Sequence, residues 1–306
     1  MHTAPLPVSR PSATAAKAFD AEAAYEYASS LLLRPTEVNP PGWRVDWADG
    51  PWPVTVRTRG RRIALGGDRG DPLLRAAGRI LFLTFAVTAV RFDPAAGLAA
   101  TPDNPVPHRK QTPFTMRRPI PSGGSMYPTE AYLLLADRSE VLHYDPYRHE
   151  LVDLGRPLPA VLNGTTLLNG TTLPDGPPAA VLVLTYRFWK NAYKYGEFAC
   201  RLGPVDAGVA LGRALRLAVA GFGPVAVPAD FDDEAVNACI GIDGTDETTY
   251  AVLTLGAGVA PGTDRRPRTA ADAARAAEPA VLERSGRITR LARFDAMQAA
   301  MRARPG

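Results

Sequence analysis

Cysteine is scarce in this chain of 306 residues, which has two, Cys200 and Cys239, together with four histidines. Two isolated cysteines do not make a disulfide framework, and no Cys or His pair has metal-ligand spacing, so we expect no metal site. The longest apolar run, residues 80–90, is about half of what a membrane-spanning helix needs. The first 30 residues also lack the apolar stretch of a secretory signal. We therefore expect a cytoplasmic protein without membrane association.

Several nucleotide and hydrolase motifs are missing as well. No G-x-G-x-x-G follows an expected strand, no Gly-Lys-Ser/Thr ends a glycine-rich loop, and no nucleophile elbow is present. The sequence thus excludes a Rossmann dinucleotide site, a Walker ATP site and an α/β-hydrolase triad. Lys and Arg number 35 against 31 Asp and Glu, a net charge of +4, with no basic stripe interleaved with aromatics. We expect no nucleic-acid partner.

The hydrophobic and charged fractions, 46% and 22%, are typical of a globular protein. Residue spacing predicts both helices and strands, without the regular strand–helix alternation of a parallel sheet, which favours the α+β class. Asp71-Pro72 is a helix start, with the carboxylate as N-cap and proline in the first turn. The predicted helices are 15–33, 71–90, 204–220 and, with a break near 285–286, 270–302. The predicted strands are 54–65, 130–136, 141–144, 151–154, 180–185 and 247–255.

The chain divides into four predicted regions without a linker that would separate two independent halves. We expect a disordered N-terminus over residues 1–14, an N-terminal extension over 15–66, a main domain over 67–262 and a helical tail over 263–306.

The segment from Arg117 to Pro128 contains the sharpest local pattern, Ser122-Gly123-Gly124-Ser125, preceded by Arg117-Arg118. Glycines let the backbone approach a ligand closely, and successive N–H groups can cradle an anion or a carbonyl oxygen. The neighbouring arginines add charge that suits phosphate. The alternative is an ordinary Pro/Gly-rich loop before a strand.

A second segment, from Tyr186 to Glu197, concentrates aromatic residues and cations. A lysine beside a tyrosine, as in Lys194-Tyr195, can transfer protons, because the cation stabilises tyrosinate and burial lowers the lysine pKa. The alternative is an amphipathic surface segment with cation–π contacts.

Three further patterns favour structural roles. Gly221-Phe-Gly223-Pro is typical of a helix C-terminus. His143 and His149 flank an expected hairpin and are taken as structural or exposed. The acidic run at 232–234 is expected to cap a helix.

Taken in order, these segments resemble the SagB-type, azoline-oxidising branch of the FMN-dependent nitroreductases. The resemblance covers roughly residues 70–260. The matching pieces are Arg118-x-x-Pro-Ser122-Gly123-Gly124-x-x-Tyr127-Pro, Leu142-x-Tyr144-Asp145-Pro, Asn191-x-Tyr193-Lys194-Tyr195-Gly196-Glu197 with Arg201, Asp206-Ala-Gly208, and Phe231-Asp-Asp-Glu-Ala-Val-Asn.

The resemblance implies an α+β, nitroreductase-like fold with a mixed or antiparallel central sheet flanked by helices and FMN at a homodimer interface. It implies that the cofactor is held by Arg118, Ser122, Gly123, Gly124, Arg201, Gly221 and Gly223, and that Lys194 and Tyr195 are catalytic. Tyr195 is the first choice as base, supported by Lys194, and the roles can be reversed. The Ser-x-Arg phosphate motif of the family is not evident, and Arg62, Arg79 or the 265–268 cluster could replace it.

The implied reaction is the oxidation of thiazoline or oxazoline rings to thiazoles or oxazoles in a ribosomally made peptide. The implied partners are the azoline-bearing precursor peptide and a cyclodehydratase complex. Three other functions stay open: an NAD(P)H-dependent reductase of a small molecule, a non-catalytic family member that binds peptide or a cyclodehydratase partner without flavin, and a related redox step on another modified peptide such as a thiopeptide or linear azole peptide.

Overall fold

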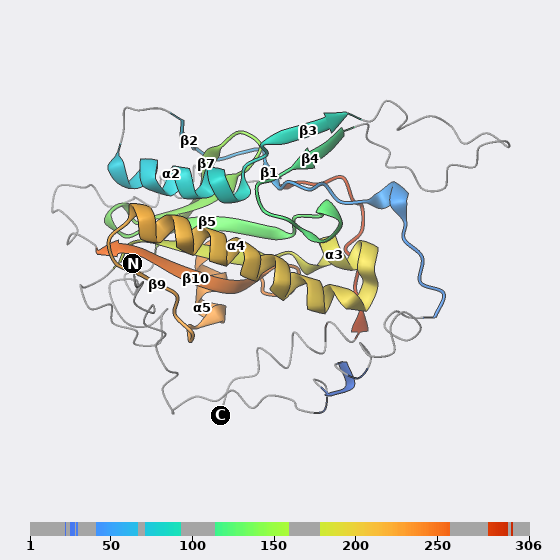
Figure 1. The fold of residues 1–306 in the computed structure, drawn as a ribbon. Helices are drawn as coiled ribbons and strands as arrows, with labels where there is room; N and C mark the ends of the chain where they lie inside the picture. Colours follow the sequence, from blue (N-terminus) through green and yellow to red (C-terminus); the bar gives the residue numbers. More distant parts are fainter. Residues whose placement is uncertain are drawn as a thin grey trace, which may run out of the picture.

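An antiparallel sheet of seven strands forms the centre of the protein (Figure 1). The computed structural model describes residues 22, 25–27, 29, 41–66, 71–92, 114–158, 178–257, 281–292 and 295. The strand order is β2-β7-β6-β5-β8-β10-β9, and each neighbouring pair is antiparallel. The bounds are β2 Arg62–Ala64, β5 Thr129–Leu135, β6 Glu140–Asp145, β7 Glu150–Pro157, β8 Pro178–Tyr186, β9 Val225–Ala226 and β10 Thr248–Ala257.

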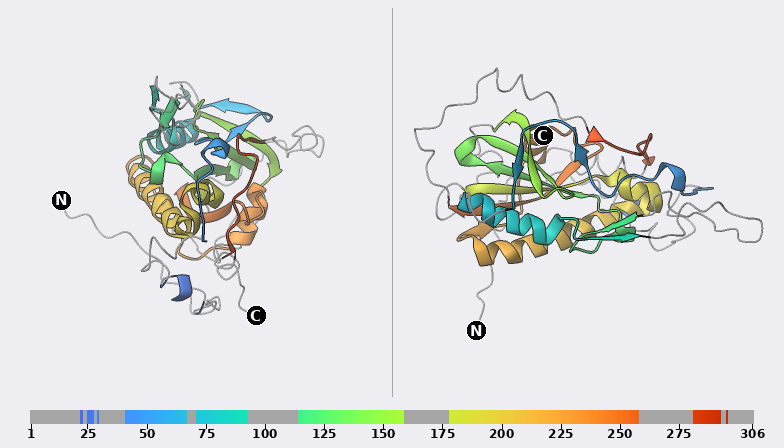
Figure 2. Two further views of the ribbon diagram at one scale, coloured as in Figure 1. Left: turned by 90° about the vertical axis from the view of Figure 1, so that its right-hand side faces the viewer. Right: turned by 90° about the horizontal axis from the view of Figure 1, so that it is seen from above.

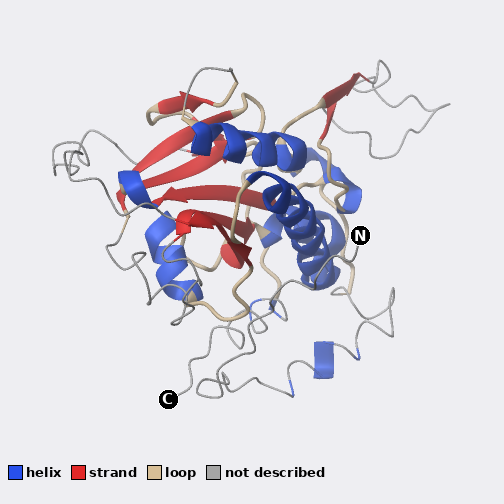
Figure 3. Cartoon of the chain, turned by 60° about the vertical axis from the view of Figure 1, so that its left-hand side comes forward, coloured by secondary structure: helices blue, strands red, loops and turns tan. Residues whose placement is uncertain are grey.

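Helices cover both faces of this sheet (Figure 3). Because side chains alternate along a strand, Leu182 and Leu184 of β8 pack in the cluster that contains α2 and α4, whereas Val181 and Val183 pack with α5. A strand buried on both faces reads as a continuous apolar run, as β8 does. The helices are α2 Pro72–Phe85, α3 Phe188–Tyr195, α4 Ala199–Gly221 and α5 Asp233–Ile240.

Two small strand pairs lie outside the main sheet. β1 (Val56–Arg57) pairs with β11 (Val281–Leu282), and β3 (Ala89–Phe92) pairs with β4 (Phe114–Arg117) in a ribbon that extends away from the sheet (Figures 1 and 2). Short 3-10 turns are formed by Trp47–Asp49, Gly123–Ser125, Ala136–Arg138 and Gly196–Phe198.

The start of α2 confirms the predicted helix cap. The Asp71 side chain accepts a hydrogen bond from Leu73 N at 2.8 Å, and Pro72 is the first helical residue. The predicted end near residue 90 is wrong, because α2 stops at Phe85. Ala86 is extended, and Val87 N donates to the Pro146 carbonyl at 2.8 Å, which turns the chain into β3.

The predicted tail helix is also wrong over residues 281–290, although positions 292 and 295 are helical as predicted. Val281 and Leu282 are paired with β1, and residues 283–290 contain no helix. Instead, the carboxylates of Asp49 and Glu283 accept hydrogen bonds from backbone N–H groups of this segment, Gly286 N at 2.6 Å and Arg284 N at 2.8 Å. Contacts with the opposite end of the chain thus override the local helical pattern.

The predicted extension and tail both pack on the main domain. β2, within the predicted extension, hydrogen-bonds to β7 at the edge of the central sheet, and β1 joins the extension to β11. Of the predicted helix 15–33, the described positions 22, 25–27 and 29 are helical, while the predicted disordered residues 1–14 lie outside the described residues. No helix in the described ranges is long and apolar enough to cross a bilayer.

Gly203 of α4 is a position where the fold requires glycine. A Cβ there would stand 2.2 Å from Cε1 of the fully buried Tyr186 ring. We therefore expect Gly203→Ala to lower the free energy of unfolding by about 1–3 kcal/mol through overpacking. Gly208→Ala, in the same helix but with nothing within 4 Å of the new Cβ, is the control, and should raise it by up to ~1 kcal/mol. Urea denaturation measures both, and equal effects would contradict the packing argument.

Candidate functional site

The Ser-Gly-Gly segment forms a tight turn immediately before β5. Ser125 N donates to the Ser122 carbonyl at 3.0 Å, and Met126 N donates to the Gly123 carbonyl at 3.2 Å. Gly124 has a φ of 60°, and the next residue, Ser125, has a φ of 61°. Left-handed backbone is uncommon for a residue with a side chain and often marks a functional site.

The Asp206 carboxylate of α4 accepts hydrogen bonds from this turn. Its Oδ2 accepts from Ser122 Oγ at 2.7 Å, its Oδ1 accepts from Gly123 N at 3.2 Å, and Ser122 Oγ in turn accepts from Tyr127 N at 2.9 Å. Burial raises the pKa of the Asp206 carboxyl. Sequence reasoning noted Asp206 only as part of a helix start, although a carboxylate within an apolar helix pattern was a usable signal.

Helix α3 brings the Lys-Tyr pair to the same turn. Tyr195 ends α3, and Gly196, with a φ of 55°, turns the chain away. A Cβ on Gly124 would lie 2.4 Å from Tyr195 Oη and 2.6 Å from Lys194 Nζ, so both side chains rest on the Gly124 backbone. The turn and the pair, 70 positions apart in sequence, therefore meet within one chain.

Among the described residues, no carboxylate forms an ion pair with Lys194. Its Nζ lies 5.6 Å from the centre of the Trp47 ring and 5.3 Å from that of Tyr195. Burial lowers the pKa of Lys194, because removal of water disfavours the ammonium form. The amine is thus more easily neutral than an ordinary surface lysine, which suits proton transfer.

A cavity of about 430 Å³ is lined by Lys194 and Gly124, and Tyr195 is not among its lining residues. Aromatic and apolar side chains dominate its lining, and the charged residues among them are three cations, Lys194, Arg148 and Arg284. The lining residues are Trp47, Gly50, Pro51, Trp52, Pro53, Val54, Val56, Phe114, Thr115, Met116, Gly124, Ser125, Met126, Tyr147, Arg148, Tyr193, Lys194, Leu282 and Arg284. A flat, apolar group with an anionic end fits such a lining.

Residues 50–56, which we call the wall segment, form one side of the cavity and are tied down at several points. Arg284 Nε donates to the Gly50 carbonyl at 2.7 Å, and Trp52 N donates to Glu283 Oε1 at 2.9 Å. Arg118 donates from Nη2 to the Pro53 carbonyl at 2.5 Å. Arg118, predicted to bind cofactor, is thus buried behind the wall segment and is not among the residues that line the cavity.

The other predicted cofactor residues lie away from the cavity in this chain. Arg201 is exposed in the first turn of α4. Gly221 ends α4, 15 positions after Asp206, which is about 22 Å along the helix axis, and Gly223 follows it. Within one chain the structure does not bring Gly221 and Gly223 to the Ser-Gly-Gly turn, whereas Arg201 adjoins Leu202, whose side chain would lie 3.5 Å from a Cβ on Gly123.

The phosphate candidates are likewise separate from the turn. Arg62 is engaged in ion pairs with Asp145 at 3.1 Å and Glu150 at 3.0 Å. Arg79 is exposed on α2, and the 265–268 cluster lies outside the described residues. Asp232 caps α5, as predicted, by accepting from Ala235 N at 2.9 Å. In the described part of the chain no group of His, Cys, Asp or Glu could hold a metal ion.

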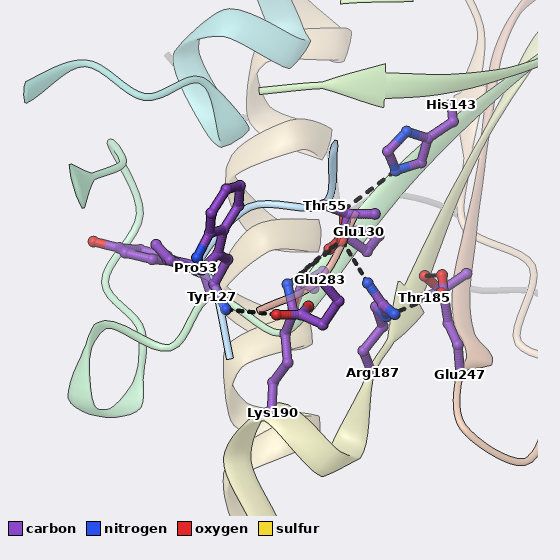
Figure 4. Close-up of polar contacts among 12 residues, drawn as sticks. Pro53, Thr55, Tyr127, Glu130, His143, Thr185, Arg187, Lys190, Glu247 and Glu283 are labelled. Carbon is purple, nitrogen blue, oxygen red and sulfur yellow. Dashed lines mark hydrogen bonds and ion pairs between the residues drawn. The ribbon is translucent and has the colours of Figure 1, made fainter. Parts of the chain in front are cut away.

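A cluster of buried charges lies beneath the wall segment and α3 (Figure 4). Glu130 of β5 forms an ion pair with Lys190 at 3.3 Å and contacts His143 Nε2 at 3.3 Å, while Arg187 pairs with Glu247 at 3.5 Å. Burial lowers the pKa of Lys190 to about 8, against the effect of Glu130. Burial acts to raise the pKa of Glu130, but Lys190 and His143 hold it well below its usual value. Sequence reasoning missed this cluster, whose members come from β5, β6, α3 and the ends of β8 and β10.

The comparison with known proteins agrees with this architecture at the level of fold. No protein-family profile and no curated protein matches the sequence. A solved structure assigned as a nitroreductase from Anabaena variabilis aligns at a TM-score of 0.57 and 21% identity, over 83% of this chain and 53% of its own length. This chain therefore spans about half of that structure. The antiparallel sheet flanked by helices is thus a nitroreductase-like fold, as predicted.

Two other solved structures are less similar. The E. coli microcin synthetase McbBCD complex with truncated pro-MccB17 bound aligns at a TM-score of 0.47 and 20% identity, over 75% of this chain and 80% of the matched one. A protein assigned as a nitroreductase from Ralstonia eutropha aligns at 0.45 and 17%, over 68% and 94%. Of the three likenesses, the Anabaena structure alone exceeds 0.5, and it defines the fold and not the activity.

Proposed function

We propose that this protein is an FMN-dependent oxidoreductase that converts thiazoline or oxazoline rings of a ribosomally made peptide into thiazoles or oxazoles. The observation that carries the proposal is the contact of Lys194 and Tyr195 with the Gly124 backbone at the edge of an aromatic cavity. In the SagB-type proteins that the sequence resembles, a Lys-Tyr pair at this point of the motif order is catalytic. The proposal includes a homodimer, a cytoplasmic location, and a cyclodehydratase partner that supplies the azoline peptide.

The residues at the cavity suit FMN. Gly124 and Ser125 of the turn line the cavity, Gly124 without a side chain, and the Trp47 and Trp52 side chains among the lining are flat and apolar. We assign the turn to the ring edge of the flavin. Because no carboxylate lines the cavity within the described residues, its cations can serve a phosphate; Arg284 is the candidate we add to those from sequence.

Azoline oxidation removes a proton from one ring carbon and a hydride from its neighbour. FMN, when bound, supplies the hydride acceptor and passes the two electrons on to dioxygen. Lys194 and Tyr195 supply the proton acceptor. The half-buried amine of Lys194, whose pKa is lowered by burial, can take the proton directly, or keep Tyr195 competent to take it. The aromatic lining orients the ring and excludes water.

The test is the colour of the purified protein, followed by anaerobic mixing. We expect a yellow protein, or one that becomes yellow with FMN, whose colour bleaches on mixing with an azoline-bearing peptide. The peptide should lose two hydrogen atoms by mass spectrometry. Bleaching by NADPH, with the peptide inert, would replace the proposal by a small-molecule reductase. A protein that stays colourless after FMN addition would replace it by a peptide-binding member without flavin.

A further inference from the structure

Both sides of the cavity are attached to one carboxylate oxygen. Oε1 of Glu130 accepts a hydrogen bond from Thr55 Oγ1 at 2.5 Å and from Lys190 Nζ at 3.3 Å (Figure 4). Thr55 belongs to the wall segment, between the cavity-lining Val54 and Val56. Lys190 belongs to α3, one helical turn before Lys194. The separation between the wall and the Lys-Tyr pair therefore depends on Glu130.

The cations around Thr55 strengthen this attachment. Arg187 Nη1 donates to Thr55 Oγ1 at 2.7 Å, and Lys190 Nζ lies 3.5 Å from the same oxygen. Thr55 and Glu130 are each 2% exposed and Lys190 is fully buried. Hydrogen bonds to ionised groups in such surroundings are among the strongest in proteins, and a lost partner leaves a buried charge uncompensated.

A hydrophobic contact in place of the Glu130–Lys190 ion pair would be less costly in free energy, because two charges lose much of their hydration energy when they are buried. The ion pair instead fixes the direction and the distance between the Glu130 carboxylate and the Lys190 amine. His143 Nε2 contacts the other carboxylate oxygen, Oε2, so both oxygens of Glu130 are engaged and the carboxylate cannot rotate freely. The wall and α3 are thus held to one rigid point on β5.

We propose that Glu130 is a positioning residue that sets the width of the cavity by holding Thr55 of the wall segment and Lys190 of α3 at one carboxylate. The inference rests on the proposed function for its meaning in catalysis. Its structural part, the coupling of the wall to α3, holds for any ligand of the cavity.

The variant that tests this coupling with least disturbance is Thr55→Val, which removes the hydroxyl and keeps the side-chain shape. We expect hydrogen exchange of backbone amides in both the wall segment and α3 to accelerate by about tenfold or more, equivalent to ~1.4 kcal/mol. We expect FMN to bind more weakly by a similar factor. Thr55→Ser, which restores the hydroxyl, should return both quantities toward the wild-type values.

The matched control is Thr84→Val in α2. Thr84 is also fully buried, but its hydroxyl has no hydrogen-bond partner within the described residues. Exchange in the wall segment and α3 should be unchanged in this variant. Lys190→Met provides the second arm, because it removes the α3 contact and leaves the wall contact with Glu130.

The outcomes separate this inference from the proposed function. Faster exchange in both segments in Thr55→Val, without any FMN binding by the wild type, would sustain the coupling and remove the flavin role. Faster exchange confined to the wall segment would overturn the coupling, as would a failure of Thr55→Ser to rescue. A fall in melting temperature with unchanged exchange and unchanged FMN affinity would show that the cluster is structural only.

Discussion

Replacing Lys194 by alanine is expected to lower the turnover of an azoline peptide by about 10²–10⁴-fold while FMN binding persists. In the proposed mechanism the half-buried Lys194 amine takes part in proton transfer at the Gly124 turn, and alanine removes it without filling the cavity. Tyr195→Phe should show a loss of the same order, because it removes the hydroxyl that rests on the same backbone. Steady-state kinetics, together with the flavin absorption spectrum, measure both effects.

Tyr250→Phe is the control for Tyr195→Phe, because it also removes one tyrosine hydroxyl. Tyr250 packs edge-on against Tyr186 with ring centres 5.3 Å apart and is not among the cavity-lining residues. Turnover should stay within about twofold of wild type in this variant, since it removes no proton-transfer group. Turnover like that of the wild type in both Lys194→Ala and Tyr195→Phe would remove the catalytic assignment.

Gly124→Ala is expected to lower kcat/KM by about 10²-fold, because catalysis is sensitive to displacements of about 1 Å. The new methyl would overlap Tyr195 Oη at 2.4 Å and Lys194 Nζ at 2.6 Å, and alanine is also strained at a φ of 60°. The Lys194 and Tyr195 side chains must therefore both move off the turn. Steady-state kinetics measure the loss of kcat/KM, and circular dichroism shows whether the variant is still folded.

The neighbouring glycine provides a graded comparison. A Cβ on Gly123 would lie 3.5 Å from the Leu202 side chain, which is an ordinary contact, so Gly123→Ala should reduce kcat/KM less than Gly124→Ala does. Gly212→Ala, with nothing within 4 Å, should leave it unchanged. If Gly123→Ala proved the more damaging, the contact of the pair with Gly124 would not be what matters.

Local chemistry accounts for the parts of the fold that sequence predicted. The Asp71 and Asp232 caps, the β6–β7 hairpin and the apolar run of β8 depend on neighbours within a few positions. The end of α2 and strand β11 were mispredicted because distant partners decide them. Val281, for example, pairs with Arg57 at the other end of the chain.

The residues of the candidate site likewise divide into those that a local sequence pattern indicates and those that it does not. Glycine chemistry singled out the turn at Gly124, and resemblance, not spacing, joined it to Lys194. Asp206 and Glu130 escaped notice because a carboxylate is informative only once its buried partners are known. Those partners come from segments distant in sequence, the Ser122-Gly123 turn for Asp206 and Thr55, His143 and Lys190 for Glu130, and no local pattern encodes them.

The cavity draws its rim from both extremes of the described chain. Trp52 N reaches Glu283 across 231 positions, and Ser285 Oγ donates to Asp49 at 2.9 Å. During synthesis, the ribosome must release residues beyond 285 before these bonds can form. A nascent chain whose sheet has already folded consequently lacks the part of the cavity lining that Leu282 and Arg284 supply. The cavity can therefore be completed only after this segment has left the ribosome.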